Sequence, residues 1–137
     1  MKHAALIAVA ATFAAAPLFA EDHMAPMVEA SNQSVANGVV SASSVVAPAN
    51  GWMVVHRTDA DMRPGPVVGY APIRAGETAD VAAILTEAVA PGDMLMLMVH
   101  GETGGMSTGI FEYTLGASED GPIRIDGNLV MSVITAE

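Results

Sequence analysis

The sequence predicts an all-β fold, an immunoglobulin-like antiparallel β-sandwich of about seven to eight strands that follows a signal peptide. Two observations predict it. Short apolar runs alternate with turn residues roughly every 8–12 residues along the chain. Two of these runs, at residues 51–56 and 94–100, are too short for ordinary helices, and each ends in a histidine. We therefore expect these two strands in the interior, with the others packed around them.

Residues 1–20 have the layout of a secretory signal peptide. Lys2 supplies a positive start, residues 4–16 carry no charge, and Ala20 precedes two acidic residues. The apolar stretch is shorter than the roughly 20 residues that a membrane-spanning helix needs. We expect cleavage after Ala20 and a periplasmic or secreted protein with no membrane insertion, made of a flexible leader at 21–26 and one β-sandwich domain at 27–137.

The lack of cysteine limits how the chain can be cross-linked or anchored, and its charge limits which partners it can bind. The chain has no cysteine, which excludes disulfides and a lipid-anchored cysteine. After loss of Lys2, four arginines stand against fifteen acidic residues, a formal charge of −11. Such a field repels nucleic acid and anionic membranes and attracts cations. We expect no nucleic-acid partner, and as partner an envelope protein or a second copy of the chain.

The first strands lie between clear turn signals. A weak strand at 28–30 and 34–35 ends at Asn37-Gly38, a pair typical of hairpins because both central residues of that turn need positive φ. The next strand interleaves serine with valine, and a Pro-Ala-Asn-Gly turn leads into the run that contains Trp52. A loop with two aspartates and two prolines precedes another valine-rich run. These elements are strands at 39–46, 52–57 and 67–73, with the loop at 58–66.

The second half continues the pattern. The run after Gly76 suits a helix or a strand by composition, and we choose a strand. Pro91 and Gly92 turn the chain into the central run, and a glycine-rich stretch leads from it to a run with two aromatic residues. Asp126-Gly127 closes a hairpin. These elements are strands at 80–89, 94–100 and 110–115, and a closing hairpin of 123–125 with 129–134.

Each histidine run is followed by a methionine at the same spacing. Met62 comes six residues after His56, and Met106 six residues after His100. Imidazole and thioether together suit copper, especially Cu(I), because soft ligands select that ion. The pattern predicts two separate candidate metal sites, one for each pair. The alternative is two similar strand–loop units, from convergence or an old duplication, in which each histidine is a hydrogen-bonded strand-end residue.

A single site that uses both histidines is not expected. An odd number of reversing connections separates the two strands, so they should run antiparallel with their histidine ends on the order of 20 Å apart. Period two puts three methionines of the central run on the side of His100, where such side chains commonly fill core gaps: Met94, Met96 and Met98. Further candidate copper ligands lie in and beside the leader: His23, Met24 and Met27.

No catalytic motif in the sequence has the surrounding structure that its chemistry requires. Residues 105–109 match the nucleophile elbow of serine hydrolases around Ser107, but that elbow needs a following helix and a much larger domain. No phosphate-binding glycine motif, calcium loop or paired-histidine metal motif is present. We therefore expect no enzymatic activity and no catalytic residue.

Several short stretches form a recognisable set: GWMVVH at 51–56, VGY at 68–70, AGE at 75–77, LMVH at 97–100, GIFE at 109–112 and DGPI at 120–123. With Gln33 near the start, they resemble an uncharacterised exported domain, domain of unknown function 7282, which is frequent in surface proteins of halophilic archaea and occurs in some bacteria. The resemblance runs from about residue 27 to 136. It implies an extracytoplasmic β-sandwich without an established activity.

These observations lead to one expected function and one alternative. We expect an exported, non-enzymatic β-sandwich module with a binding or structural role at the cell envelope and no required cofactor. The alternative is a periplasmic copper-binding or copper-handling protein that uses histidine and methionine ligands.

Overall fold

The computed structural model describes residues 24–137, so the predicted signal peptide and the leader as far as residue 23 lie outside the described part. Its strands are β1 (Met27–Glu29), β2 (Val39–Ala47), β3 (Gly51–Thr58), β4 (Val67–Ile73), β5 (Gly76–Ile84), β6 (Met94–Gly101), β7 (Arg124–Ile125), β8 (Asn128–Leu129) and β9 (Met131–Thr135). Among residues 24–137 there is no helix long and apolar enough to cross a membrane.

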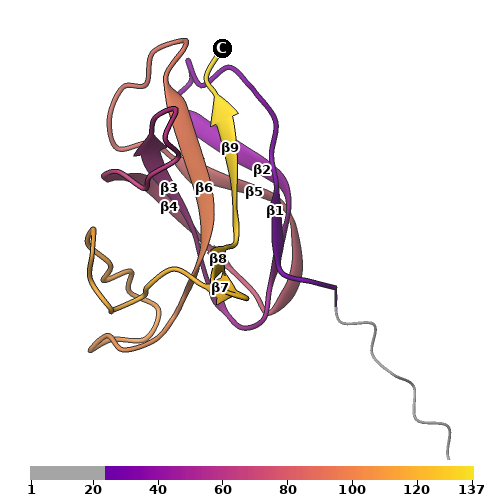
Figure 1. Cartoon of the computed structure of the whole chain (residues 1–137), viewed down its shortest axis with the longest axis vertical. Helices are drawn as coiled ribbons and strands as arrows, with labels where there is room; N and C mark the ends of the chain where they lie inside the picture. The colour runs from indigo at the N-terminus through magenta and orange to yellow at the C-terminus, as the bar shows by residue number, and fades with distance from the viewer. Residues whose placement is uncertain (1–23) are drawn as a thin grey trace, which may run out of the picture.

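Two sheets pack face to face (Figure 1). One has the strand order β1-β2-β5 and the other β4-β3-β6-β9, while β7 and β8 form a separate small hairpin. All strand pairings are antiparallel. In the letters used for immunoglobulin domains, this order corresponds to A-B-E against C′-C-F-G. The predicted immunoglobulin-like all-β sandwich is therefore confirmed.

The central run of the sequence is an interior strand. β6 lies between β3 and β9, and its residues from Leu95 to the end of the strand are buried on both sides. Strands covered on both faces have continuous apolar sequences rather than alternating ones. One side of β3 and β6 joins the core between the sheets through Met53, Val55, Leu95, Leu97 and Val99. We call the other side, turned away from the three-stranded sheet, the outer face.

Most predicted strands are present, and several predictions need correction. The first strand is Met27–Glu29, so the predicted piece at 34–35 is in no strand. The ambiguous run after residue 75 is a strand, although it begins at Gly76 and ends at Ile84. Residues 110–115 are not a strand but an irregular segment with turns. Their backbone pairs with no strand, and their aromatic side chains cover the outer face. The closing hairpin is β7 with β8 only, and β9 pairs with β6 instead.

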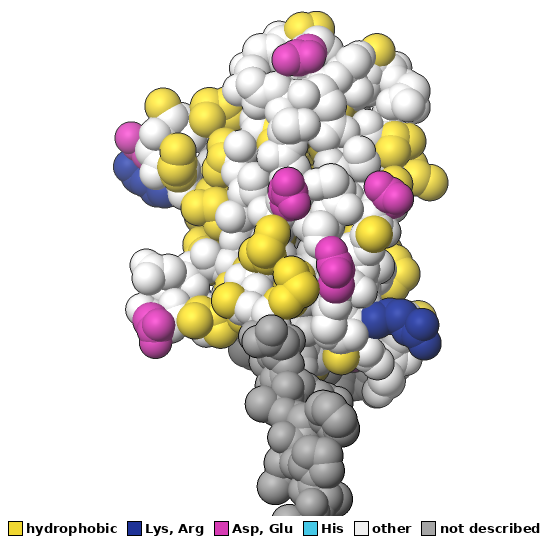
Figure 2. Space-filling model, turned by 90° about the vertical axis from the view of Figure 1, so that its right-hand side faces the viewer, with side chains coloured by type: hydrophobic (Ala, Val, Ile, Leu, Met, Phe, Trp, Pro, Cys, Tyr) yellow, Lys and Arg dark blue, Asp and Glu magenta, His cyan; other side chains and the backbone are white. Residues whose placement is uncertain are grey.

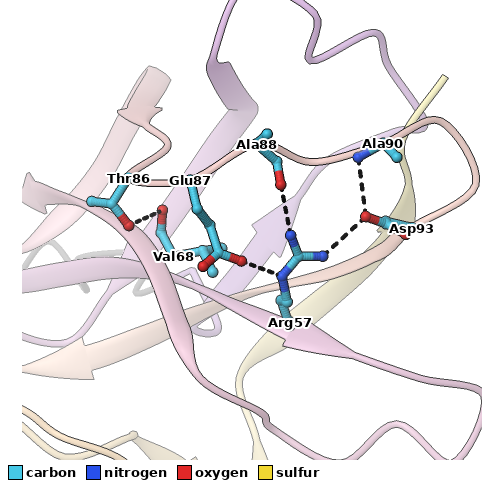
Figure 3. A network of polar contacts seen from close by, with 7 residues as sticks. All are labelled: Arg57, Val68, Thr86, Glu87, Ala88, Ala90 and Asp93. Atoms are coloured by element: carbon cyan, nitrogen blue, oxygen red, sulfur yellow. Dashed lines mark hydrogen bonds and ion pairs between the residues drawn. The ribbon is translucent and has the colours of Figure 1, made fainter.

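The connection between β5 and β6 is tied to the end of β3 by Arg57 (Figure 3). Its guanidinium donates to the carboxylates of Glu87 and Asp93 and to the carbonyl of Ala88. The Ala90 N–H also donates to Asp93. Hydrogen bonds to Glu87 and Asp93 raise the pKa of Arg57, and those from Ala90 and Arg57 lower the pKa of Asp93. This network fixes a connection that has no regular structure after Ile84.

Acidic side chains are spread over one face of the molecule. In Figure 2 the Asp and Glu side chains are scattered over the visible face, and basic side chains lie only near its margins. This distribution offers a diffuse field rather than one acidic patch.

Candidate functional site

His56 and His100 meet in the outer face of the four-stranded sheet. β3 and β6 pair so that His56 lies opposite Met96 and His100 opposite Trp52. The two histidines are thus four register positions apart, ~13 Å along the strands. Their side chains bridge this gap, because the two Nε2 atoms are 3.2 Å apart and both residues are fully buried.

The expected separation of the two histidines is therefore wrong. The strands do run antiparallel, but each histidine lies before the last residue of its strand, so the offset between them is shorter than the predicted ~20 Å. Both imidazoles also lie on the same face, where two long side chains can lean toward each other. The structure thus brings the two histidines together as one pair.

The hydrogen-bond partners fix the tautomer of both rings. His56 Nδ1 is 2.8 Å from the carbonyl oxygen of Gly65, and His100 Nδ1 is 2.7 Å from that of Asp120. A carbonyl oxygen only accepts, so each Nδ1 carries the hydrogen and donates it. In the neutral rings, both Nε2 atoms then carry a lone pair. The pair consequently brings together two acceptors with no hydrogen between them.

The orientation of the rings aims these lone pairs at each other. The ring centroids are 5.3 Å apart, whereas the Nε2 atoms are only 3.2 Å apart. The difference is nearly the width of one imidazole ring, so the two nitrogens lie close to the line that joins the ring centres. The planes differ by 29°, but the contact is end to end rather than face to face.

Burial keeps both imidazoles neutral. Desolvation lowers the pKa of His56, and the hydrogen bond to Gly65 offsets only part of this effect. Desolvation also lowers the pKa of His100, to about 4, against a smaller opposing effect of the hydrogen bond to Asp120. A positive charge on either ring disfavours one on the other. Near neutral pH the pair therefore offers two free lone pairs.

Residues 102–122, which we call the covering segment, close the outer face (orange in Figure 1). The ring of Tyr113 lies edge-on to both histidines, with centroids 4.6 Å from His100 and 5.9 Å from His56. Phe111 stacks on Tyr70 at 4.3 Å and meets Trp52 edge-on at 5.5 Å. These contacts shield the histidine pair from water with aromatic rings.

Asp120 holds the covering segment in place, and the sequence analysis missed it. Asp120 is fully buried with a positive φ of 45°. Its carboxylate accepts hydrogen bonds from the N–H groups of Thr103 and Glu112, while its carbonyl accepts the Nδ1 hydrogen of His100. One residue thus closes the segment and orients a histidine. The only sequence signal was the short DGPI stretch at 120–123.

The structure places the predicted methionine ligands outside the pair. Met62 is 53% exposed and Met106 is 96% exposed, while the histidines are fully buried. Met24 of the leader is also exposed, Met27 begins β1, and His23 lies outside the described residues. The methionines that share the outer face with the histidines are instead residues of β6 and β9, of which Met96 and Met98 are fully buried: Met94, Met96, Met98 and Met131.

A cleft beside the aromatic cluster does not open on the histidines. Its volume is about 240 Å³, and its lining includes Trp52, Arg74 and Glu102 but neither histidine. Ser107 lies in a turn of the covering segment, with no helix after it, so its surroundings do not form a nucleophile elbow. Within residues 24–137 no group of three or more His, Asp or Glu side chains is arranged to hold a metal ion.

The comparisons with known proteins give one match. No curated protein and no solved structure matches the chain. A family model does match, over residues 26–137, and this range includes both histidines, the central methionines and the whole covering segment. The chain therefore belongs to the family described as "Domain of unknown function (DUF7282)".

Proposed function

We propose that this protein is an exported, non-enzymatic β-sandwich module that binds copper as Cu(I) between His56 and His100. One observation carries the proposal. The two Nε2 atoms face each other at 3.2 Å in a fully buried setting, and both Nδ1 hydrogens are already donated to backbone carbonyls. Two converging imidazole lone pairs are the donor arrangement of a metal ligand pair.

The close approach of the two Nε2 atoms becomes favourable only when a cation lies between them. A buried acceptor without a donor costs roughly 1–3 kcal/mol, and here two of them face each other. A proton between the rings would relieve this cost, but burial disfavours the charged imidazole and lowers the pKa of His100 to about 4. A metal ion relieves it at neutral pH without protonating either ring. The backbone carbonyls behind both rings supply the outer hydrogen bonds that metal-ligating histidines usually have.

The surroundings favour Cu(I) over harder or more highly charged ions. Both ligands are neutral, and aromatic and apolar side chains enclose them, so a monovalent ion costs less to bury than a divalent one. Zinc in structural sites is almost always bound by four ligands. Thioether and imidazole donors are those that copper accepts readily.

The remaining features support a binding role outside the cytoplasm. The N-terminal segment has the pattern of a secretory signal, and the charge of the chain, −10 with the segment included, attracts cations from solution. The histidine pair lies under the covering segment rather than in an open cleft, a setting suited to holding an ion and not to turning over a substrate. Copper carriage or storage at the cell envelope is the role that these features support.

Anaerobic titration of the purified protein with Cu(I) tests the proposal. We expect saturable uptake of one equivalent, lost in His56→Gln and His100→Gln. The matched controls are Met62→Leu and Met106→Leu, which replace exposed methionines and should bind as the wild type does. Uptake that does not saturate, or that survives both histidine substitutions, would overturn the proposal.

Imidazole ¹⁵N NMR gives a test that needs no variant. In the metal-free protein at neutral pH, both rings should show a protonated Nδ1 and an unprotonated Nε2. Addition of Cu(I) should shift both Nε2 signals and leave both Nδ1 hydrogens in place. Unchanged Nε2 signals at saturating Cu(I) would refute the assigned site even if copper binds elsewhere.

A further inference from the structure

The position of one buried methionine extends the proposed site. Between the pair His56 with Met96 and the pair Trp52 with His100, the register of β3 and β6 contains three pairs, of which only Val54 with Met98 points to the outer face. Directly paired residues of antiparallel strands point to the same face. The two imidazoles therefore converge above the row that holds Met98, which lies ~7 Å along the strand from each histidine position.

The spacing of the Nε2 atoms indicates where an ion would lie. With metal–nitrogen bonds of about 2 Å, two-coordinate linear binding needs the nitrogens ~4 Å apart, and three-coordinate binding at 120° needs ~3.5 Å. The observed 3.2 Å is close to the second value. An ion displaced from the line between the nitrogens would leave the two nitrogens almost where they are while each ring tilts toward the ion, and it would have room for a third ligand.

The sheet side of the pair offers a third ligand. On the outer side lies the ring of Tyr113, roughly perpendicular to both imidazoles. On the sheet side lie Val54 and Met98, both fully buried, and beyond Met98 lies its β9 partner Met131, which is only half-buried. Of these residues, Met98 alone combines full burial, direct pairing with β3 and a donor atom, a soft thioether on a flexible side chain.

We propose that the thioether of Met98 is the third ligand of the ion held by His56 and His100, which makes the site three-coordinate and selective for soft ions. This inference rests on the proposed function. Met96 is the matched comparison, because it is equally buried on the same strand and face. It lies directly opposite His56, whose ring leans away from it toward His100.

Copper X-ray absorption on the Cu(I)-loaded wild-type protein tests the inference. We expect a first shell of two nitrogens and one sulfur. When the protein is labelled with selenomethionine, the sulfur scatterer should be replaced by selenium, a result that depends on no substitution. A shell of nitrogens alone in both samples would overturn the inference while leaving the histidine site intact.

Two variants assign the sulfur. Exchanges between Met and Leu conserve volume and usually cost less than about 1.5 kcal/mol, so both variants should fold. Met98→Leu should remove the sulfur scatterer and weaken Cu(I) binding by about tenfold or more, while Met96→Leu should keep the sulfur and the affinity of the wild type. Sulfur that survives Met98→Leu would refute the assignment. Absence of Cu(I) uptake in the wild type would instead refute the proposed function itself.

Discussion

Acidification should destabilise the metal-free protein through the histidine pair. Burial lowers the pKa of His100 to about 4, against 6.5 in an unfolded chain, and it lowers the pKa of His56 in the same direction. Between these two pH values the unfolded state binds more protons than the folded state, so the free energy of unfolding falls as pH decreases. The stability is fully present above pH 6.5 and is lost progressively toward pH 4.

The expected size follows from the shift of His100 alone. Each pKa unit corresponds to 1.36 kcal/mol, so the full loss between pH 6.5 and pH 4 is about 3 kcal/mol. About 2 kcal/mol of it should be lost between pH 7 and pH 5. His56 adds a further loss of the same sign. For a domain of this size the loss is a large share of a total stability of about 5–15 kcal/mol.

Urea unfolding at pH 7 and pH 5, with a copper chelator present, measures this loss. The range excludes the contribution of Asp93, whose lowered pKa removes stability only below its unfolded value of 3.8. His100→Gln is the control, and its unfolding free energy should depend much less on pH. Equal or higher stability at pH 5 would refute the reasoning, because it would mean that one proton is shared between the two Nε2 atoms and raises the pKa of the pair.

Three further predictions concern the frame of the site. Asp120→Ala leaves two N–H donors of the covering segment without their acceptor and should lower the free energy of unfolding by about 2–4 kcal/mol, measured by urea unfolding; a loss under about 0.5 kcal/mol, the usual range for a surface substitution, would contradict this. Gly51→Ala puts a Cβ 2.2 Å from the carbonyl oxygen of His100 and should cost about 2 kcal/mol or more, whereas the facing Gly101→Ala, whose nearest contact is 3.5 Å away, should cost under about 1 kcal/mol; equal thermal shifts in the two variants would argue against the close approach of the strands. Arg57→Lys keeps the charge but not the forked geometry and should cost about 1 kcal/mol at low salt, with a smaller difference in 1 M NaCl; a cost that salt does not change would show that packing, not charge, is at work.

The strands that the sequence predicted well are those whose local pattern and tertiary role agree. β4 has the predicted limits, because its valine-rich run lies between a proline-rich loop and a turn. β6 was found from an unbroken apolar run, which is what burial on both faces requires. Residues 110–115 also have strand-favouring residues, but they pair with no strand and pack their aromatic rings on the outer face, so tertiary contacts override local propensity there.

The candidate site was predicted in part. His56 and His100 were recognised because a histidine that ends an apolar run is unusual, but their meeting depends on the register of two strands far apart in sequence, which no local pattern contains. Asp120 was missed for a related reason. Its role comes from a left-handed backbone and a buried carboxylate in a glycine-rich segment whose path the sequence does not define.

The histidine pair lowers the stability of the metal-free fold, and this favours a role in binding. Two imidazoles occupy fully buried positions in a face otherwise made of Trp52, Val54, Met96 and Met98. Apolar residues of similar volume there would bury no unpaired acceptor and would create no sensitivity to acid. Both rings are nevertheless anchored at Nδ1, one from the loop after β3 and one from the covering segment. Buried histidines in a structural role would need the same anchors, but they would not need two Nε2 lone pairs 3.2 Å apart, whereas a ligand pair does, because both lone pairs then bind a common ion.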